Sequence, residues 1–189
     1  MLVYFKWLQK SLSSVLISSF LTKEHITLVI EKEHLIDVLC FLQKHTNCIF
    51  TVLTDVACVD YPFKQNRFEV IYQLLSLKYN SRISIKVTAK PDETIPSATS
   101  VFKAANWYER EAFDLFGVFF SKHPDLRRIL TDYGFEGHPI RKDFPLTGYH
   151  ELKYSTEKKR VVSESLELSQ EFRLYSFISS TQLTKPVIK

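Results

Sequence analysis

Residues 67–88, RFEVIYQLLSLKYNSRISIKVT, hold two strand patterns joined by a short turn. In the second half, apolar and polar residues alternate from Ile83 to Thr88, which is typical of a strand with one buried face and one face in water. The first half, residues 67–77, is rich in β-branched and aromatic residues, and Asn80-Ser81 provides a turn. These features predict two neighbouring antiparallel strands.

Two further strands and two helices are expected before this pair. Residues 49–59 form another β-branched and aromatic run, and the turn-rich residues 60–66 separate it from the next strand, as in a hairpin. Residues 26–31 alternate as a strand, and apolar spacing from Glu33 to His45 predicts a helix with one buried face. The serine-rich, arginine-free N-terminus is interpreted as an amphipathic helix rather than an organelle transit peptide. Its apolar residues recur at helical spacing, at Phe5, Leu8, Leu12, Val15 and Leu16.

A last helix is expected to begin at Asn106 and to end at Gly117. The Asn106 side chain can cap the first turn while Glu109, three residues later, reaches back as in a capping box. The resulting order, α-β-α-β-β-β-α, predicts an α+β fold over residues 1–120: a two-layer domain with a mixed, mostly antiparallel sheet covered by helices. Residues 121–189 are expected to form an extended, irregular partner-docking segment and a C-terminal tail.

All four glycines and three of the seven prolines lie between residues 117 and 148. Because each proline favours extended geometry in the residue before it, only a short helical turn at residues 125–130 is expected there. Long irregular stretches are uncommon in compact domains and usually serve a function. Aromatic residues interleave with arginines in this region, as at the anchors of protein interfaces, so we predict a docking surface. The residues concerned are Phe119, Phe120, Tyr133, Phe135, Phe144, Tyr149, Arg127, Arg128 and Arg141.

The composition argues against several classes of protein. The chain has 189 residues and a formal net charge of +4, which fits one globular domain with an appended segment and is weak evidence for nucleic-acid binding. Cys40, Cys48 and Cys58 match neither paired zinc clamps nor a redox CxxC motif, so we interpret them as buried thiols. The most apolar N-terminal stretch is far shorter than the ~20 residues of a membrane span. No nucleotide-binding or hydrolase motif is present in the sequence.

Two motifs carry a family resemblance. EREAFDLF at residues 109–116 is followed by His123, Arg127 and Ile129-Leu130, and TDYGFEGHPIRKDFPL occupies residues 131–146. Together they resemble the signature of the 30 kDa subunit of respiratory complex I, in its mitochondrial and related bacterial form.

The resemblance implies a core subunit of the peripheral arm of the proton-translocating NADH:ubiquinone oxidoreductase. Such a protein contributes to the assembly and structure of the arm. It lies against the 49 kDa subunit and other peripheral-arm subunits, and it is associated with the membrane only through the complex. It is expected to hold no cofactor, metal or catalytic residue, because NADH, FMN, the iron–sulfur clusters and ubiquinone are handled by neighbouring subunits. The location implied is the matrix side of the mitochondrial inner membrane.

The charged residues of this region allow two interpretations. Arg110 and Asp114 are four residues apart and could form a solvated helix pair worth only ~0.2–0.5 kcal/mol. Alternatively, Glu109-Arg110-Glu111 joins the arginines of the irregular segment in a partly buried network, in which the loss of one charge is strongly destabilising. In that case Arg127→Ala or Glu109→Ala should lower the amount of assembled complex more than the activity of each assembled complex. The residues expected in this network or at a partner contact are Glu109, Arg110, Glu111, Asp114, His123, Pro124, Arg127, Arg128, Tyr133, His138, Arg141, Lys142 and Asp143.

Several side chains have competing interpretations. His123 and His138 are expected to form hydrogen bonds to the backbone rather than to bind a metal, because neither has a second ligand at a recognised spacing. Trp107 and Tyr108 are expected in the core. The main rival function is RNA binding by the arginines and lysines of the segment. The field of these cations is largely cancelled by interleaved carboxylates, so no nucleic acid is expected; the carboxylates are those of Asp125, Asp132, Glu136 and Asp143.

The tail, residues 149–189, has few core-forming runs and is expected to be disordered as an isolated chain. We expect it to become ordered on a partner through Val161-Val162 and through an apolar group formed by Phe172, Leu174, Tyr175 and Phe177. Within it, VVSE at residues 161–164 and QEFR at residues 170–173 resemble the C-terminal extension of the same family.

Overall fold

The computed structural model describes residues 2–22, 25–168, 170 and 173. The chain divides into two compact units, residues 1–146 and residues 147–189. The expected boundary at residue 120 therefore falls inside the first unit. The reason is that residues 122–146, although irregular, are hydrogen-bonded to the helix and sheet before them.

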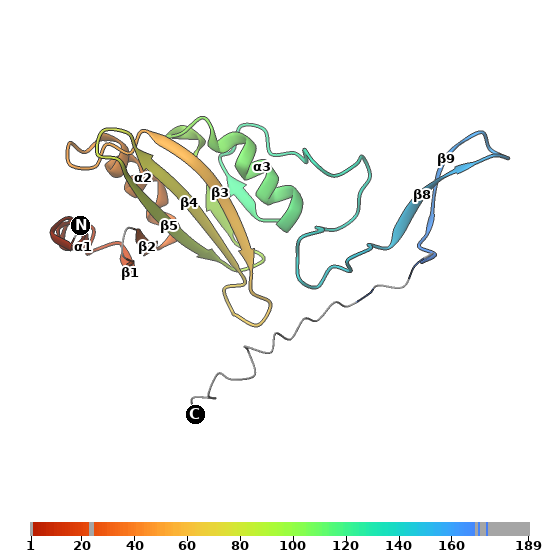
Figure 1. Ribbon diagram of the computed structural model, residues 1–189, viewed down its shortest axis with the longest axis horizontal. Coiled ribbons are helices and arrows are strands. Elements are labelled where there is room, and N and C mark those ends of the chain that lie inside the picture. The colour runs from red at the N-terminus through yellow and green to blue at the C-terminus, as the bar shows by residue number, and fades with distance from the viewer. Residues whose placement is uncertain (1, 23–24, 169, 171–172, 174–189) are drawn as a thin grey trace, which may run out of the picture. The chain divides into compact units, whose positions relative to one another are not determined.

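A mixed five-stranded sheet forms the centre of the first unit (Figure 1). Its strand order is β1-β2-β5-β4-β3, and β2 and β5 are parallel while the other neighbours are antiparallel. The predicted strands are all present, and the α+β class is confirmed. The strands are β1 Leu16–Leu21, β2 Ile26–Ile30, β3 Val52–Asp60, β4 Phe68–Ser76 and β5 Ser81–Ala89.

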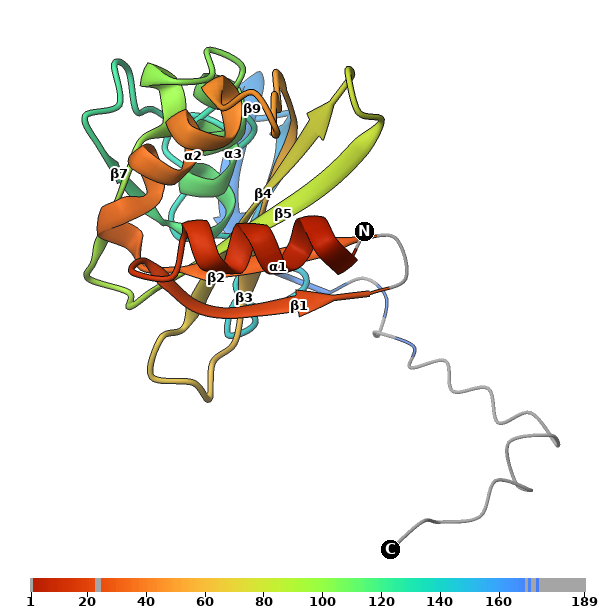
Figure 2. The ribbon, with the colours of Figure 1, turned by 90° about the vertical axis from the view of Figure 1, so that its left-hand side faces the viewer.

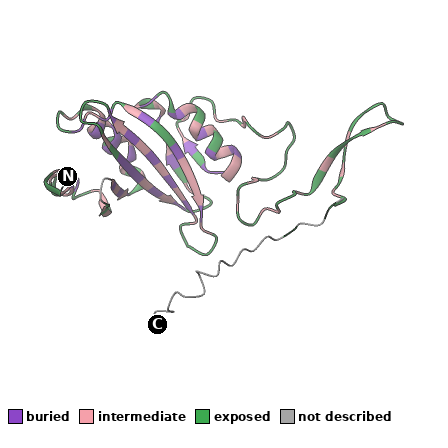
Figure 3. Ribbon diagram, in the orientation of Figure 1, coloured by how far each residue is buried: buried purple, intermediate pink, exposed green. Residues whose placement is uncertain are grey.

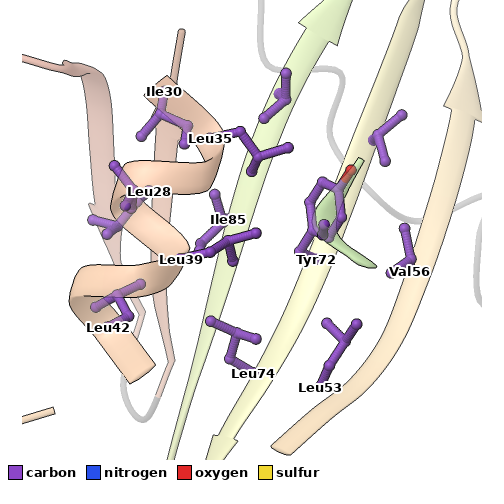
Figure 4. Close-up of a cluster of buried hydrophobic side chains, with 14 of the residues drawn as sticks. Leu28, Ile30, Leu35, Leu39, Leu42, Leu53, Val56, Tyr72, Leu74 and Ile85 are labelled. Atoms are coloured by element: carbon purple, nitrogen blue, oxygen red, sulfur yellow. The ribbon is translucent and has the colours of Figure 1, made fainter. Parts of the chain in front are cut away.

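The helices gather on one face of this sheet, as the view in Figure 2 shows for α2 and α3. Alternate residues of β4 are buried, which is the pattern of a strand with one face against a helical layer. In Figure 4, Leu35, Leu39 and Leu42 of α2 face Leu74 and Ile85 of the sheet, and all five are buried. The helices are α1 Leu2–Ser11, α2 Leu35–Lys44 and α3 Ala105–Phe116, with short 3-10 turns η1 Lys32–His34 and η2 Ala98–Ser100.

The N-terminal region differs from the predicted single helix. Helix α1 ends at Ser11, and Leu16 begins β1, which pairs with β2. Helical spacing at Val15 and Leu16 is therefore coincidental. Ser13 and Ser14 interrupt the helix, and the chain instead completes the sheet with an edge strand, which gives its backbone groups hydrogen-bond partners.

Helix α3 begins differently from the prediction and ends as predicted. Its N-cap is Ala104, without a side-chain hydrogen bond, so the capping box of Asn106 and Glu109 is not formed. Gly117 adopts the left-handed conformation at the C-cap, with a φ of 75°. Trp107 is 68% exposed, so its assignment to the core is wrong.

Two short strands after the main sheet were not predicted. β6 Thr94–Pro96 pairs in parallel with β7 Phe119–Ser121. The parallel pair holds the entry and the exit of the α3 region side by side. Such pairing between distant short runs leaves no periodic signal in the sequence.

The second unit contains an antiparallel hairpin of β8 His150–Ser155 and β9 Arg160–Ser165 (Figure 1). This part of the tail was expected to be disordered, and the structure shows regular strand pairing there instead. The expected ordering group at residues 172–177 lies outside the described residues, except for Arg173.

Candidate functional site

Asp114 is fully buried in the last turn of α3 and binds the irregular residues 122–146, here called the anchored segment. Its Oδ2 accepts hydrogen bonds from the successive backbone N–H groups of Ile129, Leu130 and Thr131 at 3.2, 2.8 and 2.9 Å. Its Oδ1 accepts the Thr131 hydroxyl at 2.6 Å and lies 3.4 Å from Nη1 of Arg128. These bonds take N–H groups that a helical turn at residues 125–130 would use, so the predicted turn is wrong.

The charge of Asp114 is maintained by these contacts. Burial by itself would raise the pKa of this carboxyl, but the hydrogen bonds from Thr131, Leu130 and Ile129 outweigh burial and hold the pKa below its ordinary value. Asp114 is therefore ionised at neutral pH, and both of its oxygens remain acceptors for the anchored segment.

Two arginines bind the backbone of the anchored segment. Arg128 donates from Nη1 to the carbonyl of Gly137 at 2.9 Å, beside its contact with Asp114. Arg110 donates from Nε to the carbonyl of Arg127 at 3.1 Å, and its Nη2 lies 3.5 Å from the carbonyl of Arg128. Arg110 and Asp114 therefore both turn to the anchored segment, instead of forming the solvated pair with each other that the spacing allowed.

The anchored segment also caps the C-terminus of α3. The carbonyl of Asp114 accepts a hydrogen bond from Nδ1 of His138 at 2.8 Å, and the next carbonyl accepts the N–H of Ile140 at 3.2 Å. The carbonyl after that accepts a hydrogen bond from Nε of Arg141. These carbonyls have no partner inside the helix, and the negative end of the helix dipole favours a cation such as Arg141.

Gly117 allows His138 and Arg141 to approach the helix this closely. A Cβ atom on Gly117 would lie 2.3 Å from Nη2 of Arg141 and 2.5 Å from Nε2 of His138. Burial, together with the charges of Arg141 and Arg128, lowers the pKa of His138. The imidazole is therefore neutral at neutral pH, with its proton on Nδ1, where it is donated to the α3 carbonyl.

A second buried carboxylate, Asp60 at the end of β3, fixes the later part of the anchored segment. Arg67 donates to both of its oxygens, at 2.7 and 2.8 Å, and also lies 2.9 Å from Oδ2 of Asp143. The backbone N–H of Lys142 donates to Asp60 at 2.9 Å. The hydrogen bonds from Arg67 are the main cause of the lowered pKa of Asp60. Asp60 and Asp114 thus act alike, since each is a buried anion that accepts backbone N–H groups of the anchored segment.

Glu109 faces a different part of the chain. Its fully buried carboxylate accepts hydrogen bonds from the Ser97 hydroxyl and from the Ala98 N–H, both at 2.6 Å. Nε2 of His123 donates to the carbonyl of Asn106 at 3.2 Å and lies 3.8 Å from Oε2 of Glu109. Burial raises the pKa of Glu109 to about 7, despite its two hydrogen bonds. Glu109 therefore does not join the arginines of the anchored segment; it connects α3 to the turn that follows β6.

The outer side of the anchored segment is apolar. Tyr133 is fully exposed, and Leu130, Ile140 and Leu146 expose 60, 48 and 78% of their surface. Figure 3 shows this part of the chain mainly as exposed and intermediate. The segment thus has an inner side bound to buried carboxylates and an outer side with large apolar side chains.

Some of the predicted site residues lie on the surface. Glu111, Pro124 and Tyr133 are exposed. The Arg127 side chain is 71% exposed and pairs with Asp125 at 2.8 Å, a surface ion pair of small energetic value. Its backbone carbonyl, rather than its charge, takes part in the contact with α3.

Three residues that position the site are missing from the sequence prediction. They are Asp60, Arg67 and Ser97, which bind Lys142, Asp143 and Glu109. The first two are opposite charges at the two ends of the predicted turn 60–66, which is a signal for a pair across the hairpin. Ser97 lies in a loop and has no comparable signal.

Comparison with known proteins connects this site to a family. The family described as respiratory-chain NADH dehydrogenase, 30 kDa subunit, matches residues 28–150. The chain belongs to this family. The match includes both motifs from which the resemblance was drawn, and that resemblance is confirmed.

Members of the 30 kDa subunit family are similar to this chain over most of its length. NADH-ubiquinone oxidoreductase subunit 9 of Reclinomonas americana is 54% identical over 171 residues, which is 89% of this chain and 84% of the relative. An NADH-quinone oxidoreductase subunit of Rhodospirillum rubrum is 52% identical over 159 residues, or 84% of this chain and 75% of the relative. The NADH-quinone oxidoreductase subunit of the same name from Brucella ovis is 50% identical, and the match covers 96% of this chain and 90% of the relative.

Among solved structures, the fold is similar to a chain of the membrane-bound sulfane sulfur reductase (MBS), an archaeal respiratory membrane complex. The TM-score is 0.65 at 21% identity, and the match covers 76% of this chain and 85% of the other. This likeness shows a shared fold. Within the described residues, none of the helices has the length and apolar character needed to cross a membrane.

Proposed function

We propose that this chain is a structural subunit of NADH:quinone oxidoreductase, respiratory complex I, in the peripheral arm of that complex. In this proposal it supports the assembly of the arm and lies against the 49 kDa subunit. The membership of the 30 kDa subunit family and the names of the relatives from Reclinomonas and Rhodospirillum support the assignment to this complex. We also propose the matrix side of the mitochondrial inner membrane as its location, with attachment to the membrane through the complex.

The observation that carries the proposal is the two-sided character of the anchored segment. Asp114 and Asp60 fix its backbone from inside, while Leu130, Tyr133 and Leu146 remain exposed outside. A surface whose backbone is held before binding loses less conformational entropy when a partner docks. Large apolar and aromatic side chains on such a surface are the usual anchors of a stable interface.

The redox chemistry of the complex belongs, in this proposal, to neighbouring subunits that handle NADH, FMN, the iron–sulfur clusters and ubiquinone. Two of the cysteines support this part of the proposal. Burial raises the pKa of Cys58 to about 12, and burial also raises the pKa of Cys48, which lies 3.3 Å from the hydroxyl of Tyr4. Because thiolates are the ligands of iron–sulfur clusters, thiols that stay protonated are poor ligands.

The contacts of the arginines favour a protein partner over RNA. Arg128 and Arg67 bind buried carboxylates, and Arg110 and Arg141 bind backbone carbonyls. Their guanidinium groups are therefore engaged inside the chain. A phosphate-binding surface needs cations that are free to meet the nucleic acid.

The proposal is tested first on the intact complex. Membranes solubilised in mild detergent are separated on a native gel, stained for NADH dehydrogenase activity and probed with an antibody to this chain. We expect the chain in one active band of respiratory-complex size. A chain that runs only as a small free species would refute the assignment to the complex.

A pair of variants then tests the anchored segment. Asp114→Asn replaces one acceptor oxygen with an amide that faces N–H donors, and we expect the chain in the active band to fall severalfold. NADH oxidation per assembled complex should be unchanged. Asp125→Asn is the matched control, since Asp125 is exposed and pairs with Arg127 at the surface. Normal assembly with lost turnover in Asp114→Asn would contradict a structural role.

A further inference from the structure

The β8–β9 hairpin has one apolar face and one charged face. Its register places Tyr154 opposite Val161 and Leu152 opposite Ser163, so Leu152, Tyr154 and Val161 share a face. These three side chains are 63, 63 and 62% exposed. A two-stranded hairpin is at best marginally stable by itself in water. The apolar face is therefore a surface that another protein layer would complete.

The opposite face of the hairpin is already satisfied. Lys153 and Glu164 form an ion pair there, on neighbouring strands. This face has the alternation of polar side chains that is typical of a strand surface in water. The two faces therefore distinguish a side for docking from a side for solvent.

The tip of the hairpin carries three successive cations, Lys158, Lys159 and Arg160, and all three are exposed. None of them forms an ion pair with an acidic side chain in the described part of the chain. Lys159 has a φ of 51°, in the left-handed region where glycine or asparagine is less strained. A lysine at this position keeps a cation at the tip despite an unfavourable backbone conformation, which points to a use for the charge.

We infer that the β8–β9 hairpin docks on an acidic patch of a neighbouring subunit, with Leu152, Tyr154 and Val161 covered by an apolar strip beside that patch. The inference rests on the proposed function, because it takes the partner from the same complex. Charge complementarity selects the partner: the tip is cationic and unpaired, so an acidic protein surface would be attracted to it and oriented by it.

Two other occupants fit the hairpin less well. An anionic bilayer would attract the tip but repel Glu151, Glu157 and Glu164, which lie on the same small hairpin. A shaped protein surface can meet the cations without approaching these carboxylates. A second copy of this chain would bring two cationic tips together if the hairpins packed tip to tip, which is repulsive.

Zero-length cross-linking of the assembled complex tests the inference directly. A carbodiimide joins an amine to a carboxylate only where the two are in contact, and tryptic peptides identify the pair. We expect Lys158 or Lys159 to be joined to an Asp or Glu of a different subunit. Wild-type complex without such a link, or with links only to another copy of this chain, would overturn the inference. The proposed function would still stand if the chain remained in the active band of the native gel.

A matched pair of variants provides the second readout. Lys158→Glu/Lys159→Glu should reduce the incorporation of this chain into the complex by about tenfold in competition with the wild type, because like charges would face the acidic patch. The control, Lys78→Glu/Arg82→Glu, changes the charge equally at another exposed turn and should leave incorporation unchanged. Equal incorporation of the two variants would overturn the inference. A tip variant that enters the complex normally but no longer binds cardiolipin-containing vesicles would also overturn it, and would identify a bilayer as the occupant.

Discussion

At the scale of single residues, neighbouring arginines with the same charge have different tasks. Arg128 lies beside the buried Asp114 and donates to the Gly137 carbonyl, whereas Arg127 is exposed and pairs with Asp125. We expect Arg128→Ala to lower the free energy of unfolding by about 1–3 kcal/mol, because it leaves buried acceptors without a donor. Arg127→Ala should change it by less than ~0.5 kcal/mol. Urea denaturation of the purified chain measures both.

This comparison changes the expectation for Arg127. On charge alone it was a candidate for the buried network, and its substitution was expected to reduce assembly. The structure shows that α3 uses its carbonyl, which an alanine also provides. A loss of stability in Arg127→Ala equal to that in Arg128→Ala would contradict this interpretation of the two side chains.

Glu109 gives the stability of the chain a pH dependence of its own. Its pKa is raised from 4.5 to about 7 in the folded chain by burial. The folded state therefore holds a proton more tightly than the unfolded state, so stability is highest below pH ~4.5 and falls as the pH rises toward ~7. The fall from this one group is about 3 kcal/mol. Glu109→Gln cannot titrate, and we expect its unfolding free energy to lack this decrease.

The pH range separates Glu109 from the other buried acids. Asp60 and Asp114 have lowered pKa values, from an ordinary value of 3.8, so their contribution is present above that value and is lost as the pH falls through the folded pKa. Unfolding free energies of wild type and Glu109→Gln, measured from pH 4.5 to 8, therefore isolate Glu109. Parallel curves over this range would show that its folded pKa is not raised.

At the scale of elements, the end of α3 is decided by space as well as by backbone conformation. Gly117 and Gly134 have nearly the same φ, 75° and 73°, but only Gly117 has side-chain atoms within 3 Å of a Cβ position. Gly134→Ala should therefore lose about 1 kcal/mol from backbone strain alone. Gly117→Ala should lose at least twice that and displace His138 and Arg141. Hydrogen exchange of residues 137–142 would detect this release, and equal exchange in the two variants would argue against it.

The elements that the sequence predicts well are those with a local period. The alternation from Ile83 to Val87 and the helical stripe of α2 correspond to observed burial, because a face toward the core imposes its own period on the chain. β1 was missed because its mixed pattern LISSFL also fits a helical stripe starting further upstream. The anchored segment was recognised as irregular from its glycines and prolines, but its contacts have no period at all.

The candidate site could be predicted in part for the same reason. Asp114 and Arg128 stand in recognisable motifs, so the sequence places them near one another. The hydrogen bond from Lys142 to Asp60 joins residues 82 positions apart, and only the folded chain brings them together. Glu109 shows the opposite error, since its place beside Arg110 in the motif suggested a shared network, while successive helix positions point in different directions.

At the scale of the whole molecule, the anchored segment belongs to the first unit although it has neither helix nor strand. A chain that ends at Leu146 retains the bonds of Asp114 and Asp60, whereas one that ends at Ser121 keeps every helix and strand of this unit but leaves both carboxylates without their N–H partners. Buried charges without partners are strongly destabilising. We expect the chain ending at Leu146 to melt close to the full-length chain, and the chain ending at Ser121 to melt ~10 °C or more below it. Thermal unfolding followed by circular dichroism compares the two, and equal midpoints would mean that the segment only rests on the domain and does not stabilise it.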